Sequence, residues 1–185
     1  RGTLYCDFVA KIIEHVTSMG KTVMMWGDIA LEYPNALDRI PKDTILLNWW
    51  YDQNPSEEKV KRIKEQGLTQ VICPGTTSWT RLIELPSVAI PNITKFANYG
   101  NKHGVMGILN TNWGDYGHLC FDEGVLFGLA FGAAKAWNVK DTEQASACEA
   151  ILALCHGADK LLLTLVEELN QHDELFLESF GYEKA

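Results

Sequence analysis

Three segments of the chain share one order: an amphipathic stretch, a glycine, and then a short run of apolar, largely β-branched residues. The apolar runs cover 22–26, 69–73 and 105–110, and the glycines before them are Gly20, Gly67 and Gly104. Glycine is favoured just past the end of a helix, so each stretch is predicted to be a helix that ends there. The runs are apolar at consecutive positions rather than alternate ones, which is typical of parallel strands buried on both faces.

A fourth apolar run covers 44–48 and follows a turn-rich loop, so predicted strands and helices alternate along the chain. This alternation predicts an α/β fold built from βα units, in which the four runs form adjacent parallel strands in sequence order. Helices are expected at 7–19, 55–66 and 92–103, and beyond the last strand at 119–137, 141–156 and 159–180.

Length and charge limit the classes of protein that fit. The 185 residues contain no linker or change of composition, so we expect one domain, with the strands and their helices in 1–137 and C-terminal helices in 138–185. A net charge of −8 argues against a nucleic-acid partner and against an anionic membrane surface. No apolar run approaches the roughly 20 residues that a membrane-spanning helix needs.

The five cysteines show no paired spacing and are expected to be reduced and buried. Cys148 and Cys155 fall about two turns apart on one face of an expected helix, too far to form a disulfide with each other. The odd number of cysteines and the lack of an apolar signal core at the N-terminus favour the cytoplasm.

Neither a cofactor nor a metal is expected. The glycine-rich motifs that cradle phosphates are absent, and no set of His, Cys and carboxylate residues, the lone His118 included, has metal-ligand spacing. Gly124, Gly128 and Gly132 recur every four residues inside an expected helix, which indicates close packing. Ser78 lacks both a nucleophile-elbow motif and a plausible base, so a serine nucleophile is not expected.

The carboxyl ends of the four predicted strands are rich in tryptophan and polar residues. Five of the six tryptophans lie there, and Trp137 lies at the end of a helix. Loops at the carboxyl ends of parallel strands carry the active sites of such folds. Indole faces stack on the C–H face of a sugar, and Asp and Asn bind its hydroxyls, which predicts a carbohydrate or another ring-shaped ligand. The candidate binding residues are Trp26, Asp28, Trp50, Tyr51, Trp79, Asn112, Trp113 and Asp115.

Each candidate residue also has a purely structural interpretation. A single tryptophan near a strand end is often a core residue, and Asp28 or Asp115 would also suit a helix N-cap after a strand. The acidic run between Glu167 and Glu178 is interpreted as one solvated helix face. Four strands that each bring a tryptophan to the same edge favour a ligand site over packing alone.

Three of these strand ends, read in order as TVMMWGD, LLNWWY and NTNWGD, resemble the second half of the catalytic barrel of glycoside hydrolase family 20, the β-N-acetylhexosaminidases. The resemblance covers roughly residues 1–137. It implies half of a TIM (β/α)8 barrel, with about four parallel strands, from an exo-acting retaining glycosidase. It also implies that Trp26, Trp50 and Trp113 wall the sugar subsite and that Asp115 binds sugar hydroxyls.

In that family the catalytic Asp–Glu pair lies on a strand that would precede Arg1. The resemblance therefore implies that the chain holds no catalytic residue and is inactive alone. The strand that supplies a Tyr and an Asp to the substrate's acetamido group reads CPGTTSW here, which places Trp79 where the family has a tyrosine. A complete barrel takes about 250 residues, so we expect a fragment that pairs with the missing N-terminal half or with a second copy.

Two other functions remain open at this point. One is a non-catalytic carbohydrate-binding module that uses the same tryptophan face, which sugar binding by the chain alone would favour. The other is an unrelated TIM-barrel enzyme, such as an aldolase or an isomerase. Those enzymes usually carry a barrel lysine or a phosphate-binding glycine loop at the strand ends, and the sequence shows neither there.

Overall fold

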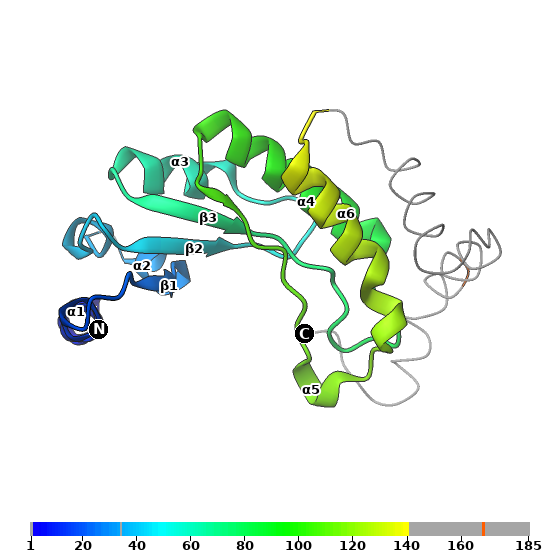
Figure 1. The fold of residues 1–185 in the computed structure, drawn as a ribbon, viewed down its shortest axis with the longest axis horizontal. Helices are drawn as coiled ribbons and strands as arrows, with labels where there is room; N and C mark the ends of the chain where they lie inside the picture. Colours follow the sequence, from blue (N-terminus) through cyan, green and yellow to red (C-terminus); the bar gives the residue numbers. More distant parts are fainter. Residues whose placement is uncertain (1, 34, 141–167, 169–185) are drawn as a thin grey trace. The chain divides into compact units, whose positions relative to one another are not determined.

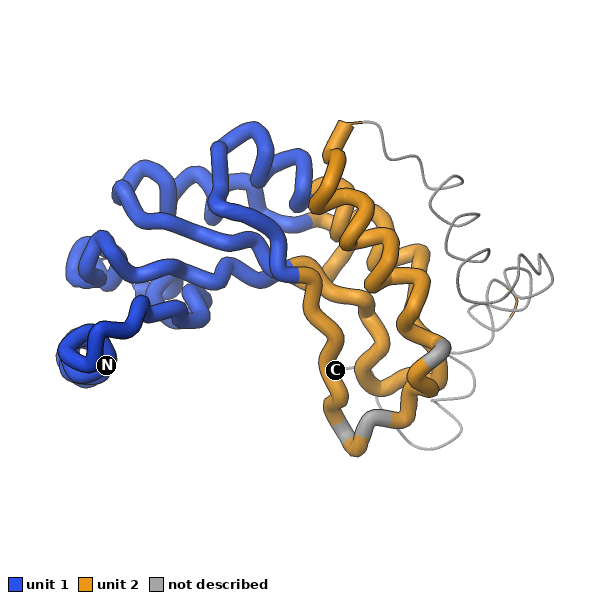
Figure 2. Tube along the Cα trace, in the orientation of Figure 1, with its two compact units in different colours: residues 1–50, 55–73, 96–109 blue, residues 51–54, 74–95, 110–185 orange. Residues whose placement is uncertain are grey.

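The computed structural model describes residues 2–33, 35–140 and 168 (Figure 1). The chain divides into two compact units, each assembled from segments that are distant in sequence (Figure 2). Unit 1 contains residues 1–50, 55–73 and 96–109. Unit 2 contains residues 51–54, 74–95 and 110–185.

Unit 1 is built around a four-stranded parallel sheet with the order β1-β2-β3-β4. The strands are β1 (Met24–Trp26), β2 (Ile45–Trp49), β3 (Thr69–Cys73) and β4 (Gly107–Ile108). Each lies within or beside its predicted apolar run and pairs with its neighbour in sequence order. The predicted α/β class and the parallel order of the strands are therefore confirmed, although β4 is shorter than the expected 105–110.

The helices of the described chain connect and flank these strands. They are α1 (Gly2–Ser18), α2 (Asp28–Glu32), the 3₁₀ turn η1 (Leu37–Arg39), α3 (Glu57–Glu65), α4 (Pro86–His103), α5 (Asp115–His118), the 3₁₀ turn η2 (Asp122–Val125) and α6 (Leu126–Trp137). The helices expected at 141–156 and 159–180 lie outside the described residues, except that Glu168 is helical and exposed.

Local chemistry explains where three of the helices end. Gly20, Gly67 and Gly104 follow α1, α3 and α4 with φ angles of 71°, 66° and 66°. Residues with a Cβ rarely adopt this left-handed conformation, so glycine is favoured at each end, as predicted. At the start of α3, the Ser56 hydroxyl caps the helix by accepting a hydrogen bond from the Lys59 amide at 3.3 Å.

Three helices begin well away from the expected positions, and the first of them is α1, which begins at Gly2 rather than at residue 7. α4 begins at Pro86, six residues before the predicted start, and carries Pro91 inside it. Proline suits the first turn of a helix because its missing N–H is not needed there, which agrees with a start at Pro86. The apolar stretch expected to be helical from 119 instead follows the end of α5, forms the 3₁₀ turn η2, and becomes α-helical only at Leu126, where α6 begins.

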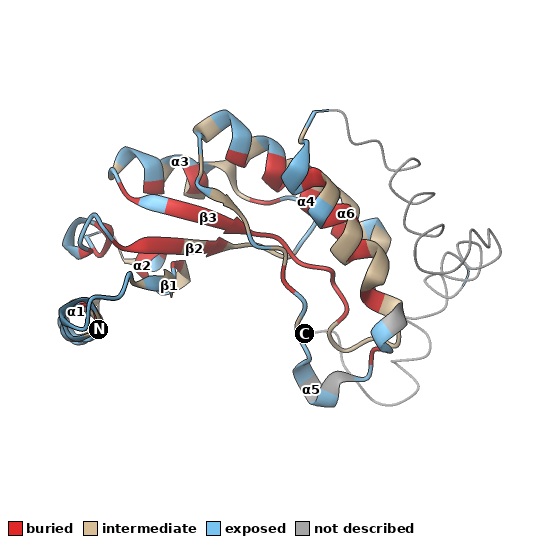
Figure 3. Cartoon of the chain, in the orientation of Figure 1, coloured by how far each residue is buried: buried red, intermediate tan, exposed pale blue. Residues whose placement is uncertain are grey.

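Helices cover one face of the sheet in unit 1, and the buried positions of β2 and β3 are visible in Figure 3. Leu46 packs against Ile63 of α3. Ile72 packs against Val60 of α3 and Phe96 of α4. The alternation of side chains along a strand places these residues on one face, as the pleat requires.

Two polar side chains on this covered face are hydrogen-bonded to each other. Asn48 and Gln70 are 2% and 3% exposed, and Asn48 Nδ2 donates to Gln70 Oε1 at 3.1 Å. Gln70 Nε2 donates in turn to the carbonyl of Val60 at 2.7 Å, which ties β3 to α3. Buried amides remain in the core because these bonds replace those they would make with water.

The opposite face of the sheet carries a second apolar cluster, formed by Ile45, Val71 and Cys73 with Leu47 and Trp49 packed against it. Burial raises the pKa of the Cys73 thiol to about 12. A thiol that stays protonated is a poor nucleophile, which agrees with a structural role. The described cysteines, Cys6, Cys73 and Cys120, are buried and form no disulfide, as expected, whereas Cys148 and Cys155 lie outside the described residues.

Unit 2 contains the N-terminal part of α4 and all of α6. Ala89 and Ile93 of α4 pack with Phe131 of α6 in one buried cluster. The Phe127 and Phe131 rings stack with their centroids 6.1 Å apart. The loop that follows β3, residues 74–85, belongs to the same unit.

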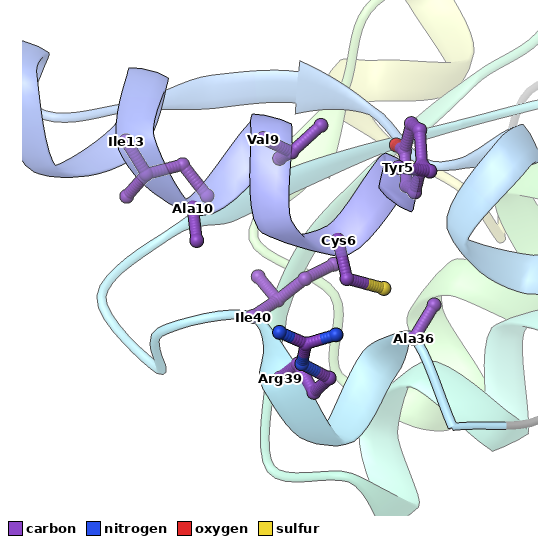
Figure 4. Close-up of a pocket in the computed structure, with 8 residues that line it drawn as sticks. All are labelled: Tyr5, Cys6, Val9, Ala10, Ile13, Ala36, Arg39 and Ile40. Carbon is purple, nitrogen blue, oxygen red and sulfur yellow. The ribbon is translucent and has the colours of Figure 1, made fainter. Parts of the chain in front are cut away.

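Among the helices that the structure describes, none is both long and apolar enough to cross a membrane. A small cavity of about 10 Å³ lies in unit 1, lined by α1 residues and by Ala36, Arg39 and Ile40 (Figure 4). Its lining includes Cys6, Arg39 and Ile40. A cavity of this volume holds about one water molecule, so it does not fit a sugar.

Candidate functional site

Three aromatic side chains form a connected group in unit 2. Tyr51 follows β2, Trp79 follows β3, and Trp113 follows β4. The rings of Tyr51 and Trp79 have centroids 5.0 Å apart and are tilted by 54°. The indole Nε1 of Trp113 donates a hydrogen bond to the Tyr51 hydroxyl at 2.7 Å. This aromatic group is only partly buried, so its rings present surface to a ligand.

Gly75 allows the aromatic group to form. A Cβ at this position would lie 3.0 Å from Tyr51 Cδ1 and 3.1 Å from Trp79 Cζ3, tighter than nine in ten real Cβ contacts, so the rings would have to shift. Asn92 of α4 holds the same segment, because its Oδ1 accepts from the Gly75 amide at 3.2 Å. Its Nδ2 donates to the carbonyl of Asp52 at 2.7 Å. One buried amide therefore ties the loops that carry Tyr51 and Trp79.

A polar group lies beside the aromatic one along the same loops. Thr76 Oγ1 donates to Asn112 Oδ1 at 2.8 Å, and Ser78 Oγ donates to the same oxygen. The two hydroxyls are 3.0 Å from each other. Thr76 and Ser78 are 0% and 1% exposed, whereas Asn112 is exposed. The carboxamide of Asn112 thus reaches from the surface to two buried hydroxyls.

The backbone of this loop is strained on both sides of Ser78 and Trp79. Thr77 and Thr80 have φ angles of 57° and 61°. A β-branched residue in this region costs on the order of 1–3 kcal/mol and persists only where the surroundings impose it. Here the Thr77 carbonyl accepts from the Leu85 amide at 3.2 Å, which closes the loop. Tertiary contacts therefore impose the orientation of Trp79.

Glu84 anchors the end of this loop to α6. It is 1% exposed, and its two carboxyl oxygens each lie 2.8 Å from the amide nitrogen of Gly128. Burial raises the pKa of Glu84 to about 8, and the Gly128 amide partly opposes this shift. No charged side chain contributes to the shift. The carboxyl is therefore protonated at neutral pH, the state in which its burial costs least.

The glycines of α6 allow this close approach. Gly128 and Gly132 face Glu84 and Asn110, and a Cβ at either glycine would overlap the facing side chain. Asn110 Nδ2 donates to the Gly128 carbonyl at 2.8 Å. The repeated glycines seen in the sequence thus serve close packing, as predicted, and the groups packed there are polar.

Four of the eight predicted binding residues belong to the aromatic group or to the polar group beside it: Tyr51, Trp79, Asn112 and Trp113. Asp115 is exposed two residues after Trp113 and is the first residue of α5, whose N-cap position is Gly114. The alternative interpretation of Asp115 as an N-cap was wrong, because the helix has no side-chain cap.

The other three predicted residues lie in unit 1. Trp26 ends β1 and is 37% exposed. Asp28 is the first residue of α2 and makes no capping hydrogen bond, so its N-cap interpretation was also wrong. Trp50 packs against the cluster around Ile72, and Lys59 Nζ lies 4.5 Å from the centroid of a Trp50 ring.

Sequence reasoning missed the roles of Thr76, Ser78, Glu84 and Asn92. Ser78 was considered only as a nucleophile, and the structure makes it a hydrogen-bond donor to Asn112. The sequence does hold one signal for a buried role of Glu84, since it is an isolated acid in the otherwise apolar stretch LIELP. Nothing in the local sequence marks Thr76 or Asn92, because their partners are distant in the chain.

The described residues contain no group of three or more His, Cys, Asp or Glu side chains able to hold a metal. What the aromatic and polar groups offer instead is partly exposed aromatic surface and an exposed carboxamide, and Asp115 adds an exposed carboxylate two residues after Trp113. Such groups bind a ring-shaped, hydroxyl-bearing molecule by stacking and hydrogen bonding. No protein-family model matches the chain, and no curated protein matches it.

Proposed function

We propose that the chain is the second half of the (β/α)8 barrel of an exo-acting, retaining glycosidase that resembles the β-N-acetylhexosaminidases. In this proposal it supplies the aromatic sugar subsite. The observation that carries the proposal is the group of Tyr51, Trp79 and Trp113, joined by an indole–hydroxyl bond and a ring contact on loops that follow parallel strands. Active sites of parallel α/β folds form on such loops.

The edges of the sheet support a partial barrel. A closed barrel has no edge strands, whereas β1 and β4 are the outer strands of the sheet formed by the described residues. Apolar side chains are exposed at both edges: Met24 of β1 is 52% exposed, and Leu109, which follows β4, is 45% exposed. On α1, Leu4 and Phe8 are 75% and 63% exposed. Such surface is normally covered by protein.

In the proposed enzyme, catalysis and sugar binding are assigned to different halves of the barrel, as they are in the family. There the substrate's 2-acetamido oxygen attacks the anomeric carbon, one of the exceptions to catalysis by a protein nucleophile. The catalytic Asp–Glu pair would come from strands outside residues 1–185. This chain would contribute stacking through Trp113 and Trp79 and hydrogen bonds to sugar hydroxyls through Asp115.

The first prediction concerns assembly. We expect the chain alone to form a dimer or larger species, because the exposed apolar surface of α1 and β1 stays uncovered in a monomer. Phe8→Glu, which places a charge on this surface, is expected to shift the population toward monomer. Light scattering measures both. Trp137→Glu is the matched control, since Trp137 is 93% exposed but lies at the end of α6. A monodisperse wild-type monomer would contradict the prediction.

The second prediction concerns activity. The chain alone is expected not to hydrolyse an aryl N-acetyl-β-glucosaminide, because loss of general acid catalysis alone costs about 10²–10⁴ in rate. Co-expression with the polypeptide that carries the other barrel strands is expected to restore turnover. In that complete enzyme, Asp115→Ala and Trp113→Ala are each expected to lower kcat/KM about 30- to 1000-fold, or roughly 2–4 kcal/mol.

Trp137→Ala is the control for this experiment, because it removes a tryptophan that lies away from the strand ends. It is expected to leave kcat/KM unchanged. Robust turnover by residues 1–185 alone would show that the catalytic residues are misplaced in the proposal. Sugar binding by this chain that is unaffected by the missing half, without any turnover on complementation, would support a carbohydrate-binding module instead.

A further inference from the structure

The orientation of the Asn112 carboxamide determines what a ligand meets at this position. A carboxamide has an acceptor side and a side with two N–H donors. In Asn112 the acceptor oxygen takes hydrogen bonds from both Thr76 and Ser78. These two hydroxyls are buried, so their hydrogens need a protein acceptor, and Asn112 Oδ1 provides it.

The donor side of Asn112 faces the other way. Asn112 is exposed, and within residues 2–33 and 35–140 its Nδ2 has no hydrogen-bond partner. The neighbouring Trp113 has its ring held by the Tyr51 hydroxyl at 2.7 Å. The exposed N–H pair therefore lies next in sequence to an indole with a defined orientation.

We propose that Asn112 is a specificity-determining residue that donates its side-chain N–H groups to an oxygen acceptor of a neutral sugar stacked on the aromatic group. Thr76 and Ser78 are positioning residues that hold the amide in this orientation. The inference rests on the proposed function and names the chemistry of the ligand at that site.

Charge favours a neutral sugar over an acidic one. Asp115, three residues after Asn112, is exposed and lies on the same segment. Its carboxylate accepts hydrogen bonds but repels a ligand carboxylate, and the chain carries a net charge of −8. A sugar hydroxyl both donates and accepts, so neighbouring hydroxyls can accept from Asn112 and donate to Asp115. A uronate carboxylate cannot donate.

The strained loop supports a positioning role for the hydroxyls. Ser78 lies between Thr77 and the stretch Trp79–Thr80, and both threonines have positive φ angles. This backbone presents the Ser78 hydroxyl to Asn112 and the Trp79 ring to Tyr51 at the same time. One loop thus positions both the polar and the aromatic parts of the site.

The decisive variant is Asn112→Asp, tested in the full chain. Aspartate keeps the oxygen that accepts from Thr76 and Ser78 but replaces the N–H donors with a second acceptor. We expect its melting temperature to stay close to that of the wild type. Asn112→Leu leaves one of the two buried hydroxyls without an acceptor, because they can donate to each other only in one direction, and it is expected to melt clearly lower. If Asn112→Asp melts as low as Asn112→Leu, the amide is oriented the other way and the inference is overturned.

The second measurement is ligand binding, followed by NMR titration with N-acetylglucosamine and with glucuronate as the carboxylate-bearing probe. We expect the wild type to prefer N-acetylglucosamine, and Asn112→Asp to weaken its binding by at least about tenfold. Asn98→Asp is the control, since it introduces the same change at an exposed position of α4 in unit 1.

The possible outcomes separate this inference from the proposed function. Binding that is lost in Trp113→Ala but unchanged in Asn112→Asp would overturn the inference and leave the sugar subsite standing. A preference for glucuronate would overturn the neutral-sugar assignment alone. Failure of the wild type to bind either sugar, both as the isolated chain and in the complemented enzyme, would overturn the proposed function and the inference together.

Discussion

The free energy of unfolding is expected to fall between pH 5 and pH 8 in the wild type, and Glu84→Gln is expected to remove this contribution. The folded state holds the Glu84 proton up to a pKa of about 8, whereas the ordinary value is 4.5. Between these values the unfolded chain binds fewer protons than the folded one, so rising pH favours unfolding. Above about pH 8 both states are ionised and the contribution levels off.

The expected size of this effect is large. Between the two pKa values the free energy of unfolding changes by about 1.4 kcal/mol per pH unit. From pH 5 to pH 8 it is therefore expected to fall by roughly 4 kcal/mol. The physical cause is the burial of a carboxyl that has the Gly128 amide as its partner. Glutamine has nearly the same shape, keeps a carbonyl oxygen to accept from that amide, and does not ionise.

Urea unfolding of both proteins at pH 5, 6, 7 and 8 measures the difference. The difference in the free energy of unfolding between Glu84→Gln and wild type is expected to be smallest at pH 5. It is expected to increase with pH in favour of the variant. Glu14→Gln serves as the control, because Glu14 is exposed on α1. Parallel pH profiles for wild type and Glu84→Gln would show that Glu84 ionises normally in the folded state.

Gly128→Ala is expected to destabilise the fold by about 2–4 kcal/mol, the reverse of the usual effect of this change in a helix. Replacing an internal helical glycine by alanine normally gains about 1 kcal/mol. Here the new Cβ would overlap Glu84 Oε2 and lie 3.2 Å from Thr76 Cγ2. Overpacking costs about 1–3 kcal/mol, and displacing the carboxyl from its amide partner costs a similar amount.

A double-mutant cycle isolates the cause. In a Glu84→Ala background the side chain that the new methyl group meets is absent, so Gly128→Ala is expected to be neutral or stabilising. Ala133→Gly, at an exposed position of the same helix, reports helix propensity alone and is expected to cost about 1 kcal/mol. A Gly128→Ala protein at least as stable as wild type would mean that Glu84 does not pack against α6.

The consequence for function lies in the loop that Glu84 anchors. Residues 74–85 carry Thr76, Ser78 and Trp79, and Glu84 ties the end of this loop to α6. Loosening that anchor is expected to free the strained backbone around Thr77. The predictions for Glu84→Gln and Gly128→Ala therefore also bear on how rigidly the proposed sugar subsite is held.

The elements that the sequence alone predicted depend on local chemistry. Continuous apolar runs placed all four strands, and their alternation with helices predicted parallel order. Gly20 and Gly67 marked helix ends because only glycine adopts a positive φ without cost. The tryptophans at strand ends located the loops on which Tyr51, Trp79 and Trp113 meet, because the direction of parallel strands determines where their loops emerge.

The detailed arrangement of the site was decided by tertiary structure, because its contacts join residues far apart in the chain. Glu84 meets Gly128 44 positions away, and Asn112 meets Ser78 34 positions away. Neighbours such as Trp50 and Tyr51 take different roles, one packed against the core of unit 1 and the other in the aromatic group. Periodicity reports which positions are apolar, but only the folded chain determines which distant groups satisfy one another's hydrogen bonds.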